Sequence, residues 1–388
     1  MSEWKKVKLG ELYEVHNGLS KGRQFFGSGY PFLTFSTVFN NWFLPETLDS
    51  LVQSSEKERT ACSIKRGDVF ITRTSETMDE LGMSSVALKD YPNATYNGFT
   101  KRLRPTTDDV IPEYIGYYLR SKKFRGKFMA FSSMTTRASL ANDDLLSMEV
   151  EIPEKFTQQH IATILSRYDS LIENYQKQIM LLEEAAQRLY KEWFVDLHFP
   201  GHENTKIVDG VPEVWEKKAL SEVSNLKAGG DKPDIVSEER TSDCNIPIYS
   251  NGTSNEGLYG YTQVPEITEQ SVTISARGSV GYTVLRRKPY LPIVRLISVI
   301  PGNIYVGYLY FFLKNTSFDS NGAAQQQITI PMIRNKEITI PCDSIIKSFK
   351  QIVEPQFAQI DILKEQIRLL TEARDRLLPK LMSGEIAV

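Results

Sequence analysis

The longest regular pattern in the chain is a series of apolar and aromatic positions separated alternately by four and three residues. The series reads Ile161, Leu165, Tyr168, Ile172, Tyr175, Ile179, Leu182, Ala186, Leu189 and Trp193. A spacing that averages 3.5 residues places these side chains on one face of an α-helix, and such a face has to be buried against another helix. The pattern predicts a helix from about Gln158 to Trp193, about 50 Å long at 1.5 Å per residue.

A related pattern occurs near the other end of the sequence, where residues 369–377 resemble residues 181–189. The second apolar face consists of Ile360, Leu363, Ile367, Leu370 and Leu377. Proline inside a helix removes a hydrogen bond and clashes with the preceding turn. We therefore expect a short helix before Pro355, a long helix that begins at Pro355, and an end at Pro379. The two apolar faces are the obvious partners for each other.

Matches outside these helices indicate that a whole unit is duplicated. Ile152-Pro153 corresponds to Ile340-Pro341 at a shift of 188 residues (340 − 152), and the same shift carries Leu182 onto Leu370. Near the beginning of each unit, the shift is 211 residues (215 − 4). The positions related in this way are Trp4, Leu9 and Glu11 with Trp215, Leu220 and Glu222. Similarly, Tyr114 and residues 117–120 find counterparts in Tyr308 and residues 311–314.

Between the helical segments, short β-branched runs alternate with turn residues, which is typical of mixed α and β structure. The predicted strands are 68–72, 85–88 and 148–152 in the first unit and 271–275, 281–285 and 337–340 in the second. One helix is predicted from Pro112 to about Phe128, with Tyr114, Tyr117, Tyr118 and Phe124 toward the core, and another from Val306 to Lys314. We divide the chain into 1–155, a spacer helix at 156–197, a linker and second domain at 198–343, and a second spacer helix and tail at 344–388.

Composition narrows the class of protein. With 388 residues, 41% of them hydrophobic and 24% charged, the chain can form two ordinary globular domains plus helical connectors. It contains no run of about eighteen uncharged apolar residues and its start lacks the apolar core of a signal peptide, so we expect a cytoplasmic protein without membrane contact. Cys62, Cys244 and Cys342 are far apart and odd in number, which favours ordinary buried or half-buried thiols.

We find no catalytic constellation, metal site or cofactor motif. The segment 27–32 lacks the pattern of a phosphate-binding loop, and no Gly-x-Ser-x-Gly elbow is present. His198 and His202 have a spacing that metal ligands use, but Pro200-Gly201 between them breaks any helix, and a turn is the better interpretation. Scattered carboxylates are better explained as solvated charges than as an acid–base pair.

Basic and amide side chains are instead concentrated at similar places in both units. Arg and Lys neutralise phosphate, and Arg, Gln and Asn can pair with base edges in the major groove. Single charge clusters are usually solvated faces, and their recurrence is what favours DNA binding. The loops 135–139 and 325–327, which align at the shift of 188, are the first candidates. The full candidate set is Lys21, Arg23, Thr72, Arg73, Lys101, Arg102, Lys123, Thr135, Thr136, Arg137, Ser139, Arg277, Ser279, Arg286, Arg287, Gln325, Gln326 and Gln327.

Taken in order, these features resemble the specificity subunit of a type I restriction-modification system. The resemblance covers essentially the whole chain and rests on the Trp-x4-Leu-x-Glu segments at Trp4 and Trp215, residues 67–70, Ile152-Pro153, residues 158–161, the two related helices and residues 378–386. The second unit has Gln270-Ser271 where the first has Gly67-Asp68, which leaves the alignment of that strand open.

The resemblance implies an α+β fold in which two similar mixed α/β target-recognition domains alternate with two long helices that form an antiparallel coiled coil. It also implies that each domain reads one half of a bipartite site in double-stranded DNA. The helices would set the gap and bind two methyltransferase subunits, through which restriction and translocase subunits join. The chain itself would be non-catalytic, without a cofactor of its own.

Two other interpretations remain open from the residues alone. One is a coiled-coil adaptor whose two globular domains bind proteins, which the nearly neutral net charge of −2 permits. The other is an enzyme whose site the motifs do not disclose. Steep salt dependence of DNA binding would separate the DNA reader from the adaptor, and activity of the purified chain alone would identify the enzyme.

Overall fold

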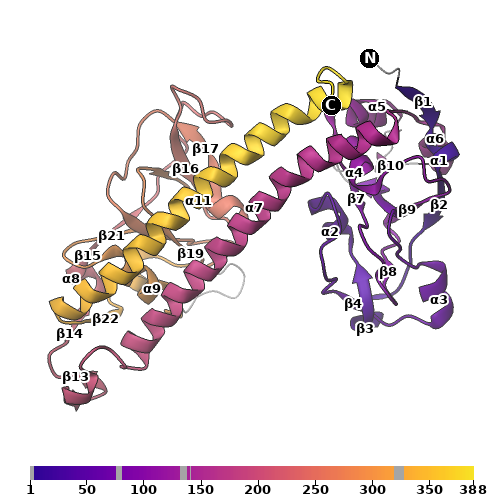
Figure 1. Cartoon of the computed structure of the whole chain (residues 1–388). Helices are drawn as coiled ribbons and strands as arrows, with labels where there is room; N and C mark the ends of the chain where they lie inside the picture. Colours follow the sequence, from indigo (N-terminus) through magenta and orange to yellow (C-terminus); the bar gives the residue numbers. More distant parts are fainter. Residues whose placement is uncertain (1–3, 76–80, 132–137, 140, 319–326) are drawn as a thin grey trace. The chain divides into compact units, whose positions relative to one another are not determined.

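A computed structural model describes residues 4–75, 81–131, 138, 139, 141–318 and 327–388 (Figure 1). The chain forms two compact units. Unit 1 comprises Met1–Gln176 with Glu365–Val388, and unit 2 comprises Lys177–Lys364. Each unit therefore contains one mixed α/β module together with part of both long helices, α7 (Lys155–Tyr190) and α11 (Asp343–Ser383).

Before α7, the described part of unit 1 contains two larger sheets, two strand pairs and seven short helices. The four-stranded sheet has the order β2-β9-β5-β7, the three-stranded sheet β4-β3-β8, and two further pairs are β1-β11 and β6-β10. Its strands are β1 (Lys5–Lys8), β2 (Tyr13–Asn17), β3 (Phe26–Leu33), β4 (Leu51–Val52), β5 (Val69–Thr72), β6 (Thr74–Ser75), β7 (Ser84–Val86), β8 (Thr95–Tyr96), β9 (Thr100–Pro105), β10 (Ala138–Ser139) and β11 (Glu149–Ile152). Its helices before α7 are α1 (Leu9–Leu12), η1 (Arg23–Phe25), α2 (Phe35–Asn40), α3 (Glu56–Ala61), α4 (Pro112–Arg120), α5 (Lys122–Phe131) and α6 (Asn142–Ser147).

Unit 2 repeats the two larger sheets and one of the strand pairs, and it has a short hairpin at residues 207–212 as its second pair. The four-stranded sheet has the order β15-β21-β18-β19, the three-stranded sheet β17-β16-β20, and the pairs are β14-β22 and β12-β13. The strands are β12 (Ile207–Val208), β13 (Val211–Pro212), β14 (Glu216–Ala219), β15 (Ser224–Ala228), β16 (Ile246–Tyr249), β17 (Leu258–Thr262), β18 (Ser271–Ile274), β19 (Thr283–Arg286), β20 (Leu291–Pro292), β21 (Ile297–Pro301) and β22 (Glu337–Ile340). The helices are η3 (Lys191–Val195), η4 (His202–Asn204), α8 (Leu220–Val223), η5 (Ser254–Gly257), α9 (Val306–Lys314) and α10 (Ile330–Ile333).

The two modules have the same topology, which confirms the duplication. In both, the first and last strands of the module pair antiparallel, and the three-stranded sheet combines one antiparallel with one parallel pair. The register also settles the strand that the sequence left open. Val69 pairs with Leu103 and Val272 pairs with Val299 on equivalent strands, so Asp68 corresponds to Ser271.

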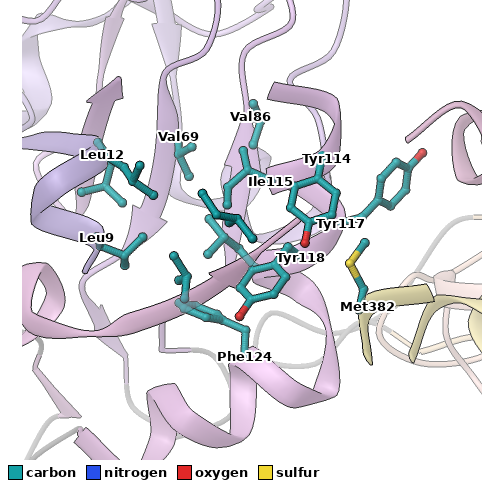
Figure 2. Packing of buried hydrophobic residues seen from close by; sticks show 14 of the residues in the cluster. Leu9, Leu12, Val69, Val86, Tyr114, Ile115, Tyr117, Tyr118, Phe124 and Met382 are labelled. Carbon is teal, nitrogen blue, oxygen red and sulfur yellow. The ribbon is translucent and has the colours of Figure 1, made fainter. Parts of the chain in front are cut away.

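The core of unit 1 is built around α4, whose buried side chains face the four-stranded sheet and α1 (Figure 2). Tyr114, Tyr117, Tyr118 and Phe124 are fully buried, as predicted. The single helix predicted for residues 112–128 is wrong, because the helix breaks at Ser121. The Ser121 hydroxyl donates to the carbonyl of Tyr118 (2.6 Å) and accepts the N–H of Phe124 (3.3 Å), so Ser121 acts as an N-cap that begins α5.

The long helices pack against each other within each unit. In unit 1, Leu381 and Met382 near the end of α11 share a core with Ile161 and Leu165 near the start of α7. In unit 2, the end of α7 packs against the start of α11 through a core that includes Ala186, Tyr190, Phe349 and Val353. The start of one helix thus meets the end of the other in both units, which is an antiparallel arrangement. Every position of the α7 ladder is buried or half-buried.

The expected interruption at Pro355 is wrong, since α11 runs through it without a break. An internal proline leaves the carbonyl four residues earlier without its helical partner, and this carbonyl belongs to Gln351, an exposed residue that water can reach. Val353 and Phe357 on either side are buried in the core of unit 2, and their burial offsets the cost. The predicted end at Pro379 is also wrong, because Leu381 and Met382 extend the buried face of α11 to Ser383.

Candidate nucleic-acid interface

At one corner of the four-stranded sheet of unit 1, the end of β5 meets the segment that precedes the last strand of the module. β5 ends at Thr72, Arg73 follows, and β6 then pairs with β10, with Ser75 opposite Ala138 and Thr74 opposite Ser139. Two polar clusters that lie more than sixty residues apart in the sequence are therefore adjacent. We call residues 73–75 with 138 and 139 the strand-end corner of unit 1.

Unit 2 has an equivalent corner. β18 is followed by Ala276 and Arg277, and the carbonyl of Ala276 accepts the N–H of Ile328 at 2.9 Å. Gln327 directly precedes Ile328 and is exposed, as are Arg277 and Ser279. Residues 276–279 with 327 and 328 form the strand-end corner of unit 2. In both units, the candidate residues that follow the inner strand (β5 or β18) therefore lie next to those that precede the last strand of the module (β11 or β22).

The corner of unit 1 also concentrates positive charge. The Lys101 side chain lies next to it, only 4% exposed, and its ammonium group donates to the Asn142 side-chain oxygen. Burial and the nearby Arg73 lower the pKa of Lys101, while Asp143 and Asp144 partly oppose this shift. The half-buried Arg73 thus lies near a second cation, an arrangement that favours an anion nearby.

Several predicted contact residues are instead part of the interior, and we remove them from the candidate interface. Arg102 is 3% exposed and donates to the backbone carbonyls of Ala61 and Ser63. Arg286 is 5% exposed, donates to the Thr273 hydroxyl and lies over the Tyr249 ring at 3.5 Å. Thr72 and Lys101 are buried as well, with Thr72 accepting the N–H of Met83. The sequence alone does not show whether a basic side chain is exposed or is buried among hydrogen-bond acceptors.

Other predicted residues are half-buried and form ion pairs. Lys21 is 2.9 Å from Glu58, and Lys123 is 2.5 Å from Glu151. Arg287 contacts two carboxylates of α11, Glu354 at 2.8 Å and Asp361 at 2.7 Å. Arg23 is exposed. Thr135, Thr136, Arg137, Gln325 and Gln326 lie outside the described residues.

Two asparagines that were not among the predicted residues fix the backbone of these corners through hydrogen bonds. In unit 2, Asn251 accepts the N–H of Ala276 at 2.7 Å and donates to the carbonyl of Val294 at 2.6 Å. In unit 1, the Asn97 side chain accepts the N–H of Phe99 at 2.6 Å, and the Phe99 carbonyl accepts the N–H of Arg73. The Asn97-Gly98 dipeptide was a turn signal in the sequence. Asn251-Gly252 is a dipeptide of the same kind, but the two hydrogen-bond partners of Asn251 are distant along the chain, so the dipeptide alone does not place Asn251 at the corner.

The described residues contain no group of three or more His, Cys, Asp or Glu side chains arranged to hold a metal ion. The three cysteines are free, with Cys62 and Cys244 buried and Cys342 half-buried, as predicted. Among the described helices, none is both long and apolar enough to cross a membrane.

Comparison with known proteins agrees with the duplicated architecture. The family model described as "Type I restriction modification DNA specificity domain" matches residues 1–184 and again residues 212–372. The specificity subunit of the type I restriction enzyme MjaIX from Methanocaldococcus jannaschii is 28% identical over 417 residues, which cover 100% of this chain and 94% of the relative. The HindI specificity subunit from Haemophilus influenzae is 25% identical over 470 residues and matches over the full length of both chains.

A solved structure shares the fold. The S subunit of a type I restriction-modification system from M. genitalium superimposes with a TM-score of 0.59 over 98% of this chain and 96% of that chain, at 16% sequence identity.

Proposed function

We propose a function that starts from the family, since the chain belongs to the type I restriction-modification DNA specificity family. It has the family's two repeats, and curated relatives that match it over its whole length are specificity subunits. We infer that the chain binds double-stranded DNA and that each repeat reads one half of a bipartite site.

In this proposal residues 1–155 and 198–343 are the target-recognition domains, and the long helices at 156–197 and 344–388 act as the spacer. The apolar seam of the spacer would consist of Ile161, Leu165, Tyr168, Ile172, Tyr175, Ile179, Leu182, Leu189, Ile360, Leu363, Ile367, Leu370 and Leu377. Its burial pattern supports this role, because every one of these side chains is buried or half-buried.

One observation carries the proposal: the same strand-end corner occurs in both modules. Each corner joins an arginine after the central strand, Arg73 or Arg277, to the polar segment before the closing strand. Base edges in the major groove are read by side chains of this kind, and a bidentate contact contributes about 1–3 kcal/mol of discrimination. Repetition of the corner gives two similar readers in one chain, as a bipartite site requires.

The enzymatic steps would belong to partner subunits. We propose that the long helices bind two methyltransferase subunits, through which restriction and translocase subunits join, and that the chain is a non-catalytic cytoplasmic protein. Curated relatives that match the chain over its whole length are named specificity subunits, which supports this division of roles.

Mapping of modified bases in DNA from cells that contain the chain and its methyltransferase partner tests the proposal. We expect a bipartite motif with a constant gap. Arg73→Ala or Arg137→Ala should relax base preference in one half only, and Arg277→Ala or Gln326→Ala in the other half only. If any of these variants relaxed both halves, the assignment of one module to each half-site would fail.

Salt dependence distinguishes a DNA reader from a protein-binding adaptor. Displacement of counterions by several phosphate contacts lowers DNA affinity by about 0.9 log units per contact for each log unit of salt. We expect such a slope for the complex with a duplex that carries the motif. An affinity for this duplex that did not change with salt would favour the adaptor.

A further inference from the structure

Beside each strand-end corner, a tight turn presents an exposed apolar side chain. In unit 1 the turn is Asn97–Thr100, between β8 and β9, and Phe99 at its tip is 59% exposed. In unit 2 the turn is Ile293–Leu296, between β20 and β21, and Val294 is 49% exposed. Single exposed apolar residues are common on protein surfaces. Here each of two equivalent turns in the duplicated modules presents one, which calls for an explanation.

Matching hydrogen bonds show that the two turns are equivalent. The N–H of Gly98 donates to the carbonyl of Leu19 at 2.9 Å, and the N–H of Val294 donates to the carbonyl of Gly230 at 2.8 Å. Leu19 and Gly230 also form parallel bridges, with Asn97 and Ile293 respectively. The two turns therefore occupy the same place in the fold, with Gly98 aligned to Val294 and Phe99 to Arg295, so the exposed apolar side chain lies one residue later in the turn of unit 1 than in that of unit 2.

The turn of unit 1 is held rigidly against the corner. The Asn97 side chain accepts the N–H of Phe99, and the Phe99 carbonyl accepts the N–H of Arg73 at 3.0 Å. The backbone on both sides of the Phe99 ring is thus fixed, while the ring itself faces solvent. A rigid aromatic side chain loses little conformational entropy when it binds.

The turn of unit 2 keeps its apolar tip at a cost to the backbone. Val294 has φ = 52° and Arg295 has φ = 62°, both in the left-handed region, which is unfavourable for a β-branched residue in particular. The Asn251 side chain donates to the Val294 carbonyl, and the N–H of Arg295 donates to the Gly229 carbonyl at 2.9 Å. Glycine would fit this backbone better, so packing alone does not account for valine. Strain of this kind is typical of binding sites.

We propose that Phe99 and Val294 are specificity-determining residues, each of which contacts the C5-methyl group of a thymine in the half-site read by its own unit. The proposal rests on the proposed DNA-binding function. The thymine methyl is the apolar feature that the major groove offers. Beside each tip lies an arginine, Arg73 or Arg295, which can position the turn by contacting a phosphate.

The test uses the full complex with its methyltransferase partner and a duplex that carries the mapped motif. Each thymine of the first half-site is replaced in turn by deoxyuridine, which lacks only the methyl group. We expect one replacement to weaken binding by about fourfold, the factor for one buried methyl-sized group. Phe99→Ala should weaken binding of the unmodified duplex similarly, and should abolish the effect of that one replacement.

A matched control separates this contact from a general effect of surface apolar residues. Phe26 on β3 is 40% exposed and lies outside the long helices and the strand-end corner, and Phe26→Ala should leave the response to every deoxyuridine unchanged. If Phe99→Ala and each deoxyuridine acted independently, or if the half-site held no thymine, the inference would be overturned while the proposed function stood. If the wild-type complex gave no bipartite motif, both would fall.

The second tip allows a test in which stability and binding change in opposite directions. Val294→Gly relieves the left-handed strain, so the melting temperature should stay level or rise. The same variant should lose about fourfold in affinity for the second half-site, together with its response to one deoxyuridine there. Val264→Ala, at an exposed valine of the same unit, serves as the control. A Val294→Gly complex that kept the wild-type response to deoxyuridine would overturn the role of this turn.

Discussion

Replacement of Asp68 by Asn removes one charge from a buried ion pair in unit 1. The Asp68 carboxylate is fully buried and accepts hydrogen bonds from Arg104 at 2.8 and 2.7 Å and from the N–H of Lys65 at 2.7 Å. The Arg104 side chain is 21% exposed. Asn keeps the shape but turns an N–H group toward the guanidinium and leaves its charge unpaired. Breaking a buried pair in this way costs about 3–5 kcal/mol. Because Arg104 retains some contact with water, we expect about 3 kcal/mol.

Thermal unfolding of the full chain, followed by near-ultraviolet circular dichroism, measures this effect. A unit of about 200 residues loses about 2–4 °C in melting temperature per kcal/mol. The transition of unit 1 should therefore fall by about 6–12 °C in Asp68→Asn. Asp108→Asn is the matched control, since Asp108 contacts Lys155 at 2.7 Å but its side chain is 93% exposed. An exposed pair of this kind contributes little. If Asp68→Asn lowered the transition no more than Asp108→Asn, burial would not be what gives the first pair its importance.

Two further variants test the interior of α11 and the acid stability of unit 1. Pro355→Ala restores a helical hydrogen bond within α11 and should raise the free energy of unfolding by about 1–3 kcal/mol in urea titrations; an unchanged or lower value would contradict the account of the continuous helix. The second variant concerns Glu58, whose pKa is lowered to about 2, first by the backbone N–H of Ser55 and then by Lys21. Its depressed pKa contributes stability that is present above pH 4.5 and is lost as the pH falls toward 2. The stability difference between wild type and Glu58→Gln should therefore shrink over that range, and a constant difference would refute this assignment.

Much of the fold could be predicted because it depends on long apolar periodicities. The ladder between Ile161 and Trp193 placed α7 within a few residues at its start and joined it to η3 at its end. α9 occupies the predicted residues Val306–Lys314. The duplication could be recognised because apolar positions in both modules preserve the same order. Burial of these positions is required for stability, so the apolar pattern can be recognised in a single sequence.

Helix breaks were less predictable, because tertiary packing can override the local sequence signal for a break. Ser121 breaks a helix through hydrogen bonds of its own hydroxyl. Pro355 does not break one, because buried residues on either side hold α11 together. The interface was harder still. Arg102 and Arg286 look in the sequence like surface cations, yet internal acceptors from distant segments surround them. Phe99 looks like a core residue and is exposed.

The duplicated modules differ at a buried ion pair. Asp68 and Arg104 form an ion pair in unit 1, but the equivalent of Asp68 in unit 2 is Ser271, which shares a 2.8 Å hydrogen bond with Tyr290. The register of the sheets places Ile300 at the position of Arg104. Neither charge is therefore present at the equivalent positions of unit 2, while the backbone pairing around them is the same.

A second example lies where each module meets the long helices. There too, a charged pair of unit 1 has no charged counterpart in unit 2. In unit 1, Arg374 of α11 donates to Asp169 of α7 at 2.6 Å. A shift of 188 residues (357 − 169 and 374 − 186) puts Phe357 and Ala186 at the corresponding places of unit 2. There Phe357 stacks on Phe311 at 5.8 Å, and Ala186 is buried in the same core. Arg374 also contacts Asp375 at 2.9 Å and the Asp169 side chain is 29% exposed, so removal of one partner alone costs less here than in a fully buried pair. Neither polar pair of unit 1 recurs in unit 2, while the main sheets are the same in both, so the topology does not depend on either pair and the side chains at the strand-end corners can differ between the two modules without altering it.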